Sequence, residues 1–76
     1  MNDALAVLAA LGQGTRLAIF RLLVRAAPDG LAAGEISATL DTPPATLSFH
    51  LAQLGHAGLV TASRRGRSIR YRVAFA

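Results

Sequence analysis

The 76-residue chain contains no cysteine, no lysine and no tryptophan. Without cysteine it has no disulfide scaffold, no zinc finger and no thiol nucleophile. Arginine or glycine interrupts every apolar stretch well before the roughly 18 residues that a membrane span requires. Near its N-terminus the chain has Asp3 and no basic segment ahead of the first apolar run, which argues against a cleaved signal peptide. We therefore expect a cytoplasmic protein that does not contact a membrane.

The residues that usually carry catalysis or bind metals are few and scattered. The four carboxylates do not pair on a common helical face, and His50 and His56 are six positions apart, where a helical metal pair needs four. The segment GQGT at 12–15 is too short for a phosphate-binding loop and lacks the following lysine. We predict that the protein is not an enzyme and that this chain holds no metal or other cofactor.

The composition predicts one small basic domain, spanning 1–76. Apolar residues make up 53% of the chain and its net charge is +4. Every basic residue is arginine, and five of the eight lie between 64 and 72. This asymmetry is typical of nucleic-acid binding, although a GC-rich genome would favour arginine equally well. A domain of this size buries only roughly 60% of its unfolded surface, so we expect it either to fold alone with a thin margin of stability or to gain stability from a partner subunit.

The first half of the chain has the apolar spacing of two helices. Alanine and leucine dominate 3–11, and Gly12 and Gly14 are expected to end that helix. Thr15 then stands as an N-cap before a second, broadly apolar helix that stops at Pro28.

Two further helices joined by a tight turn form a helix-turn-helix candidate at 32–57. The first covers 32–40 and carries Glu35 near its start, where the helix dipole favours a negative charge. The second covers 43–57, with Thr42 as the expected cap, Pro43 in the first helical position and Gly58 as the stop. Such a hairpin also occurs in domains that never contact DNA.

After Gly58 the apolar period changes from 3.6 to 2. Apolar and polar residues alternate along 68–75, where the apolar positions are Ile69, Tyr71, Val73 and Phe75. The segment 59–63 is a plausible antiparallel partner, and the basic residues 64–67 connect the two strands. The fold class we predict is mainly α with a small β-hairpin, a winged helix-turn-helix.

The helix at 43–57 has the surface expected of a helix that enters a major groove. Leu47, Leu51 and Leu54 cluster on one side and should face the core, while the opposite side carries no charge and has Phe49 near its centre. Small polar side chains there can meet base edges, and Phe49 can contact a thymine methyl. The alternatives are that Phe49 packs within its own domain and that His50 hydrogen-bonds to backbone instead of to phosphate.

The arginines of the hairpin can neutralise phosphates beside that groove, although charge on an exposed strand also protects it from aggregation. The residues we predict to bind DNA are Pro44, Ala45, Thr46, Ser48, Phe49, His50, Gln53, Arg64, Arg65, Arg67 and Arg70. The alternative function is a winged-helix protein-interaction module, which would dock a partner through Phe49 and the leucines of the first helix.

Three segments together resemble the ArsR/SmtB family of winged-helix repressors, with a likeness that runs from about Leu8 to Phe75. These segments are LGQGTRLAIFRLL at 11–23, TLSFHLAQLGHAGLV at 46–60 and RRGRSIRYRV at 64–73. The resemblance implies a homodimeric repressor that binds double-stranded DNA at an inverted repeat and leaves it when an inducer binds. It places the dimer interface on the first helix, with Leu5, Leu8 and Leu11, and on a helix after the wing.

The chain departs from the family pattern at its metal-sensing positions. Members that sense arsenic or cadmium carry cysteines where this chain has Ala32 and Gly34, so that thiolate site is absent. Other members place their metal ligands in a helix after the wing, beyond the last residue, Ala76. We expect that the natural chain continues past Ala76, and only such a segment would supply metal or metalloid ligands; the inducer is not specified by these residues.

Overall fold

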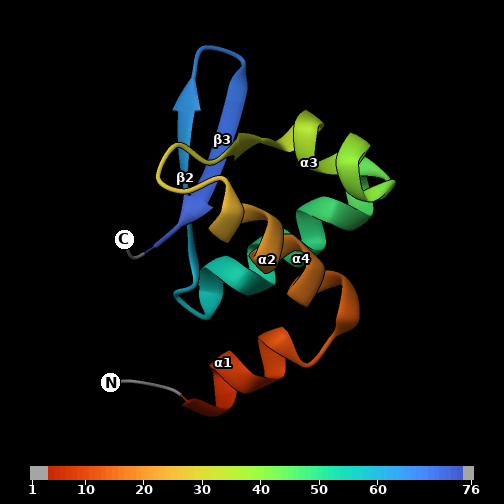
Figure 1. Cartoon of the computed structure of the whole chain (residues 1–76), viewed down its shortest axis with the longest axis vertical. Coiled ribbons are helices and arrows are strands. Elements are labelled where there is room, and N and C mark those ends of the chain that lie inside the picture. The colour runs from red at the N-terminus through yellow and green to blue at the C-terminus, as the bar shows by residue number, and fades with distance from the viewer. Residues whose placement is uncertain (1–3, 75–76) are drawn as a thin grey trace.

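Residues 4–74 are described by the structure, a computed structural model, and they form a helical domain with a projecting hairpin. The elements in chain order are α1 (Ala4–Leu11), α2 (Gly14–Arg25), β1 (Leu31–Ala32), α3 (Ala33–Leu40), α4 (Pro44–His56), β2 (Val60–Arg65) and β3 (Ser68–Val73). The hairpin of β2 and β3 lies at one end of the long axis and α1 at the other (Figure 1). The predicted fold class is confirmed.

The core lies between α2, α3, α4 and the base of the hairpin. Leu47, Leu51 and Leu54 of α4 are at most 3% exposed, which confirms the predicted core stripe of that helix. They belong to one buried cluster with residues from every other helix and from both long strands, namely Ala10, Ile19, Leu23, Ile36, Val60 and Val73. Within residues 4–74, no single helix is long and apolar enough to cross a membrane, although α1 and α2 together reach that length and composition with a 99° bend between them.

The turn between α3 and α4 is held by hydrogen bonds that differ from the predicted cap. The Ser37 hydroxyl donates to the Thr42 carbonyl at 2.6 Å, and the Thr42 hydroxyl donates to the Leu40 carbonyl at 3.1 Å. We predicted that Thr42 caps α4. This prediction is wrong, because the Thr42 hydroxyl is directed back toward the end of α3. Pro43 is the N-cap without a side-chain bond, and Pro44 begins the helix. The missing N–H of proline costs nothing in the first helical position. Pro44 occupies that position, one residue later than the predicted Pro43.

The start of α2 also differs from the prediction. Gly14 is its first residue instead of part of the preceding break, and the cap is Gln13 instead of Thr15. The side-chain oxygen of Gln13 accepts from the Arg16 backbone N–H at 3.1 Å. Glutamine is not among the preferred capping residues, and this explains why Thr15 was the more plausible choice from sequence.

The sheet has a third strand that the sequence analysis did not predict. β1 pairs antiparallel with β3, Leu31 opposite Tyr71, so the strand order is β1-β3-β2. Gly30 precedes this strand with φ 76°, and a Cβ there would meet the Tyr71 carbonyl oxygen and lie 2.8 Å from the Cβ of Arg72. Only glycine permits both this conformation and this approach of the two backbones.

Gly30→Ala is expected to lower the free energy of unfolding by more than about 1 kcal/mol, because alanine is strained at positive φ and its Cβ collides with backbone. Gly34→Ala is the matched control, since a Cβ on this α3 residue meets nothing within 4 Å. It should stabilise the domain by up to about 1 kcal/mol through helix propensity. Urea unfolding followed by circular dichroism measures both, and equal effects of the two substitutions would contradict the assigned role of Gly30.

Candidate nucleic-acid interface

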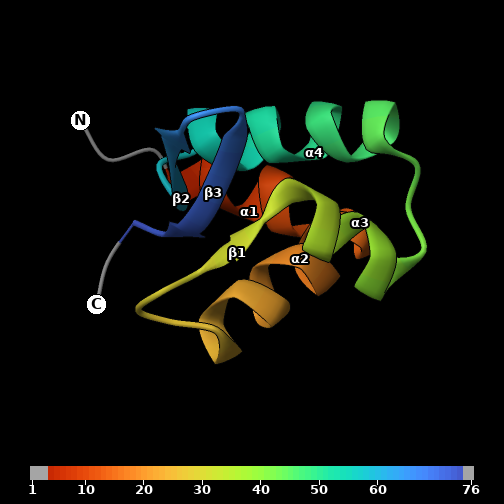
Figure 2. The same cartoon turned by 90° about the horizontal axis from the view of Figure 1, so that it is seen from above.

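The outward face of α4 is uncharged and open. Figure 2 shows α4 along one side of the molecule, with the hairpin beside its C-terminal half and α3 beneath its N-terminal half. The predicted contact residues Pro44, Ala45, Thr46 and Ser48 are all exposed. Phe49 is 58% exposed, so it does not pack into its own domain, which was the alternative left open by the sequence. An exposed aromatic ring surrounded by small polar groups is unusual for a solvated helix face and marks a contact surface.

His50 follows Phe49 on α4 but is buried, and its side chain contacts another helix. It is 8% exposed, and Arg16 Nη1 lies 3.3 Å from its Nδ1. A guanidinium has only donors, so Arg16 donates and Nδ1 accepts, which leaves the ring proton on Nε2. The His50 ring meets the Phe49 ring edge-on, with centroids 5.6 Å apart. The side-chain bond of His50 is therefore to Arg16 and not to the backbone, which was the alternative considered from sequence, and its ring packs against that of Phe49.

Arg16 ties three helices together. Its Nε donates to the Ala10 carbonyl at the end of α1 at 2.8 Å, while Nη1 reaches His50 on α4. Sequence reasoning missed Arg16 because a lone arginine near the start of a helix carries no local signal for such contacts. The sequence shows only that Arg16 lies in the first turn of the predicted second helix.

Gln53 lies apart from the exposed face of α4. It is half-buried and lines a cavity with α1 residues, including Ala6 and Ala9. Ser48 instead lines a hollow between α4 and the hairpin, together with Ala62 and Tyr71. Ser48 and Gln53, two of the three residues predicted with Thr46 to meet base edges, therefore lie on different sides of the helix.

The pairing register divides the wing arginines between two faces of the hairpin. Arg64 lies opposite Ile69, and Ala62 lies opposite Tyr71, so these residues share the face that looks toward α4. Arg65, Arg70 and Arg72 belong to the other face. Arg67 is exposed in the connecting turn. Arg64 and Arg67 are thus the basic side chains on the α4 side and at the tip of the hairpin.

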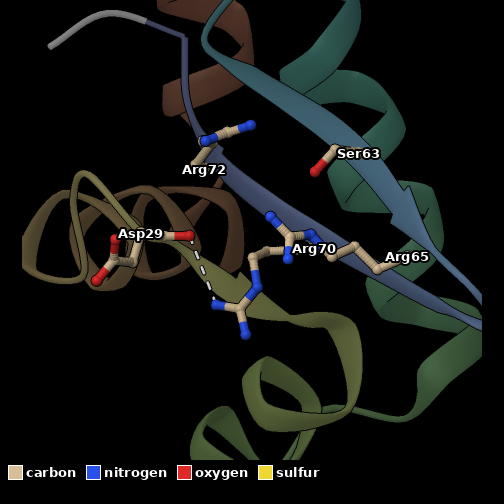
Figure 3. Close-up of a pocket in the computed structure, with 5 residues that line it drawn as sticks. All are labelled: Asp29, Ser63, Arg65, Arg70 and Arg72. Atoms are coloured by element: carbon tan, nitrogen blue, oxygen red, sulfur yellow. Dashed lines mark hydrogen bonds between the residues drawn. The ribbon is translucent and has the colours of Figure 1, made fainter.

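The outer face of the hairpin carries a shallow, strongly basic depression of about 330 Å³, lined by Asp29, Ser63, Arg65, Arg70 and Arg72. Figure 3 shows the arginines and Ser63 along the strands, with Asp29 approaching from the α2–β1 loop. Arg70 Nη1 donates to the Gly30 carbonyl at 2.8 Å and to that of Asp29 at 3.5 Å. Arg70 therefore anchors this loop to the sheet. Arg72 was not among the predicted contacts, although its alternation with Tyr71 and Val73 already placed it beside Arg70.

The three leucines predicted to form the dimer interface differ in how exposed their side chains are. Leu5 is 78% and Leu8 is 67% exposed, whereas Leu11 is half-buried and packs against the core. Leu5 and Leu8 lie one turn apart, so α1 presents an apolar surface that residues 4–74 leave uncovered.

Comparison with known proteins agrees with this geometry. The helix-turn-helix domain model matches residues 11–62. Among solved structures, HlyU from Vibrio cholerae superposes with a TM-score of 0.84 at 31% identity, covering 92% of this chain and 73% of that one. The chain belongs to the ArsR-type winged-helix transcriptional regulators. No curated protein matches it.

Two further solved structures are also similar to this chain. The homodimeric winged helix-turn-helix DNA-binding domain Mb0332 from Mycobacterium bovis has a TM-score of 0.83 at 34% identity over 92% of this chain and 62% of its own. The ArsR-like transcriptional regulator from Rhodococcus sp. RHA1 has a TM-score of 0.76 at 35% identity over 90% of this chain and 60% of its own. This ArsR-type protein is a DNA-binding transcriptional regulator and not an enzyme, so the protein-docking alternative loses its support.

Arg16→Met is expected to destabilise the domain by about 1–3 kcal/mol, because the Ala10 carbonyl and His50 Nδ1 both lose their donor while the apolar stem remains. Imidazole ¹⁵N shifts should show the Nε2–H tautomer of His50 in the parent protein and a mixed population in the variant. Arg21→Met, on an exposed residue of the same helix, is the control and should change neither quantity. Observation of the Nδ1–H tautomer in the parent protein would rule out the assigned bond.

Proposed function

We propose that this ArsR-type protein is a cytoplasmic homodimeric repressor that reads an inverted repeat in duplex DNA and releases it in response to an inducer. The observation that carries the DNA contact is the uncharged outer face of α4, with Phe49 exposed at its centre. A major groove admits a helix whose contacting residues are small enough for close approach.

In this arrangement α4 enters the major groove with its N-terminal half. Thr46 and Ser48 reach base edges, Phe49 meets a thymine methyl, and the exposed Pro44 and Ala45 let the helix start lie against the backbone. Gln53, which faces α1, is a weaker contact than the sequence alone indicated. His50 acts through Phe49 and does not touch the duplex.

The wing supplies the backbone contacts. Arg64 and Arg67 lie on the α4 side and at the tip of the hairpin, where they can neutralise phosphates beside the occupied groove. Arg65 and Arg70 were predicted to do the same, but they lie on the outer face, and Arg70 is already engaged by the α2–β1 loop. They would contribute at longer range, to the field that attracts the duplex.

A second copy of the chain is the proposed partner of α1. Leu5 and Leu8 form an exposed apolar surface, and the similar Mb0332 domain is homodimeric. In such a dimer the two α4 helices would read half-sites roughly 34–36 Å apart along one face of the duplex. Repression and release by an inducer follow from the family resemblance alone.

DNA binding is tested by fluorescence anisotropy with a labelled operator-length duplex at several salt concentrations. The logarithm of the affinity should fall with the logarithm of salt at roughly −0.9 per phosphate contacted. The double variant Arg64→Ala/Arg67→Ala should weaken binding to all sequences and reduce the magnitude of that slope by up to about 2.

Arg21→Ala/Arg25→Ala removes the same charge from exposed positions on α2 and serves as the control, which should retain the parent slope. If both double variants flatten the slope equally, the effect comes from net charge and not from the wing contacts. Salt-independent association with the duplex would refute phosphate binding altogether.

Leu5→Glu/Leu8→Glu should convert the dimer to a monomer in sedimentation velocity, because burying two carboxylates in an apolar interface is costly. The control Ala38→Glu/Thr39→Glu adds the same charge at exposed positions on α3 and should leave the dimer intact. A parent protein that sediments as a monomer, or a dimer unaffected by the α1 substitutions, would overturn the proposed interface.

A further inference from the structure

A cavity between α1 and α4 is lined by polar side chains that take no part in the proposed DNA contacts, apart from the weak contact of Gln53. Its volume is about 260 Å³, and its lining consists of Arg16, Gln53, His56 and four alanines, Ala6, Ala9, Ala10 and Ala57. Three polar side chains thus converge on a space walled by methyl groups. This combination of an apolar wall with a few placed polar groups is typical of small-molecule sites, and the volume falls just below their usual range of roughly 300–1,000 Å³.

Arg16 brings a positive charge to this cavity that its own contacts do not neutralise. It is half-buried, and both of its hydrogen-bond partners, the Ala10 carbonyl and the neutral His50 ring, are uncharged. Among residues 4–74, no carboxylate lines the cavity. A guanidinium has five N–H donors, so several of them stay available after these two bonds. Partial burial of an uncompensated charge is unfavourable, and an anion placed here would offset that cost.

Gln53 and His56 extend the donor set from the other wall. They lie three residues apart on α4 and so project from the same side of that helix. The Gln53 amide and a ring N–H of His56 can each donate to an oxygen held by Arg16. One cation with two further donors matches the charge of a monoanion. The three arginines on the outer face of the wing would suit a more highly charged phosphate instead.

We propose that this cavity binds a small carboxylate whose apolar tail packs against the alanines. The carboxylate would accept hydrogen bonds from Arg16, and from Gln53 or His56, in the charge-assisted geometry that arginine favours. Ala6 and Ala10 repeat at i, i+4 along a face of α1 other than that of Leu5 and Leu8, whereas Ala9 lies one turn after Leu5 and borders the leucine surface.

A ligand held here contacts both the helix proposed to dimerise and the helix proposed to read DNA. This regulatory part rests on the proposed function: the carboxylate would be an inducer that alters how α4 is held against α1. Arg16 already links the two helices through its bonds to Ala10 and His50, so a ligand bound to its remaining donors would change how firmly α4 is held to α1.

The binding site is tested without DNA, by ¹H–¹⁵N correlation spectra of the chain titrated with sodium benzoate at constant ionic strength. Saturable shifts are expected at Ala9, Arg16, Gln53 and Ala57, with an affinity at least tenfold higher than for benzamide, its uncharged isostere. Gln53→Leu and His56→Leu should each weaken benzoate by about fivefold, the equivalent of one hydrogen bond.

Arg21→Gln removes one exposed positive charge from α2 and should leave the benzoate affinity unchanged, whereas Arg16→Gln should abolish it. Arg16→Gln also removes the bonds to Ala10 and His50 and can therefore prevent folding. In that case the Gln53→Leu and His56→Leu variants test the binding site. Shifts that do not saturate, equal affinity for benzamide, or indifference to both α4 substitutions would overturn the site.

The regulatory part is tested by repeating the duplex titration with saturating benzoate. We expect the dissociation constant for the duplex to rise at least threefold in the parent protein, and His56→Leu to need about fivefold more benzoate for the same rise. An unchanged constant in the parent protein would overturn the regulatory part while the spectra still decide the site. Absence of any duplex binding would count against the proposed function alone.

Discussion

Burial of Leu47, Leu51 and Leu54 is the constraint on which the other features depend. Each of these side chains contributes about 1.5–3 kcal/mol when removed from water, so their placement against α2 and α3 dominates the position of α4. Once this stripe is inside, the uncharged side of the helix must face outward. The contact surface for DNA is therefore a consequence of core packing, and Phe49 is exposed because the leucines occupy the only interior available to that helix.

Arg16 adds a polar constraint to this apolar one. Its bonds to Ala10 and His50 connect the end of α1 to the centre of α4, and His50 in turn supports the Phe49 ring. A shift of α1 would consequently be transmitted to the exposed aromatic through a chain of direct contacts. The cavity with Gln53 and His56 opens beside this same guanidinium, so the regulatory hypothesis and the recognition surface share one side chain.

The wing shows how register assigns roles to residues that look alike in the sequence. Five arginines fall within nine positions, yet pairing places Arg64 on the α4 side and Arg65, Arg70 and Arg72 on the other. Arg70 also donates hydrogen bonds to the carbonyls of Asp29 and Gly30, which lie some forty residues earlier in the chain. The basic hairpin was predictable from composition, but the division of its charges was not.

The sequence by itself determined the four helices, the hairpin and the core stripe of α4, because these depend on apolar periodicity and on breakers that act locally. Some details escaped sequence reasoning although they are local: Gln13 instead of Thr15 caps α2, and the Thr42 hydroxyl bonds back to Leu40, because cap preferences did not favour either choice. Tertiary structure decided the rest. β1 forms where Gly30 lets two distant backbones meet, His50 is buried against Arg16, and Gln53 faces α1. In these three cases the deciding partner lies on another element, and periodicity within one segment carries no information about which partner will be near.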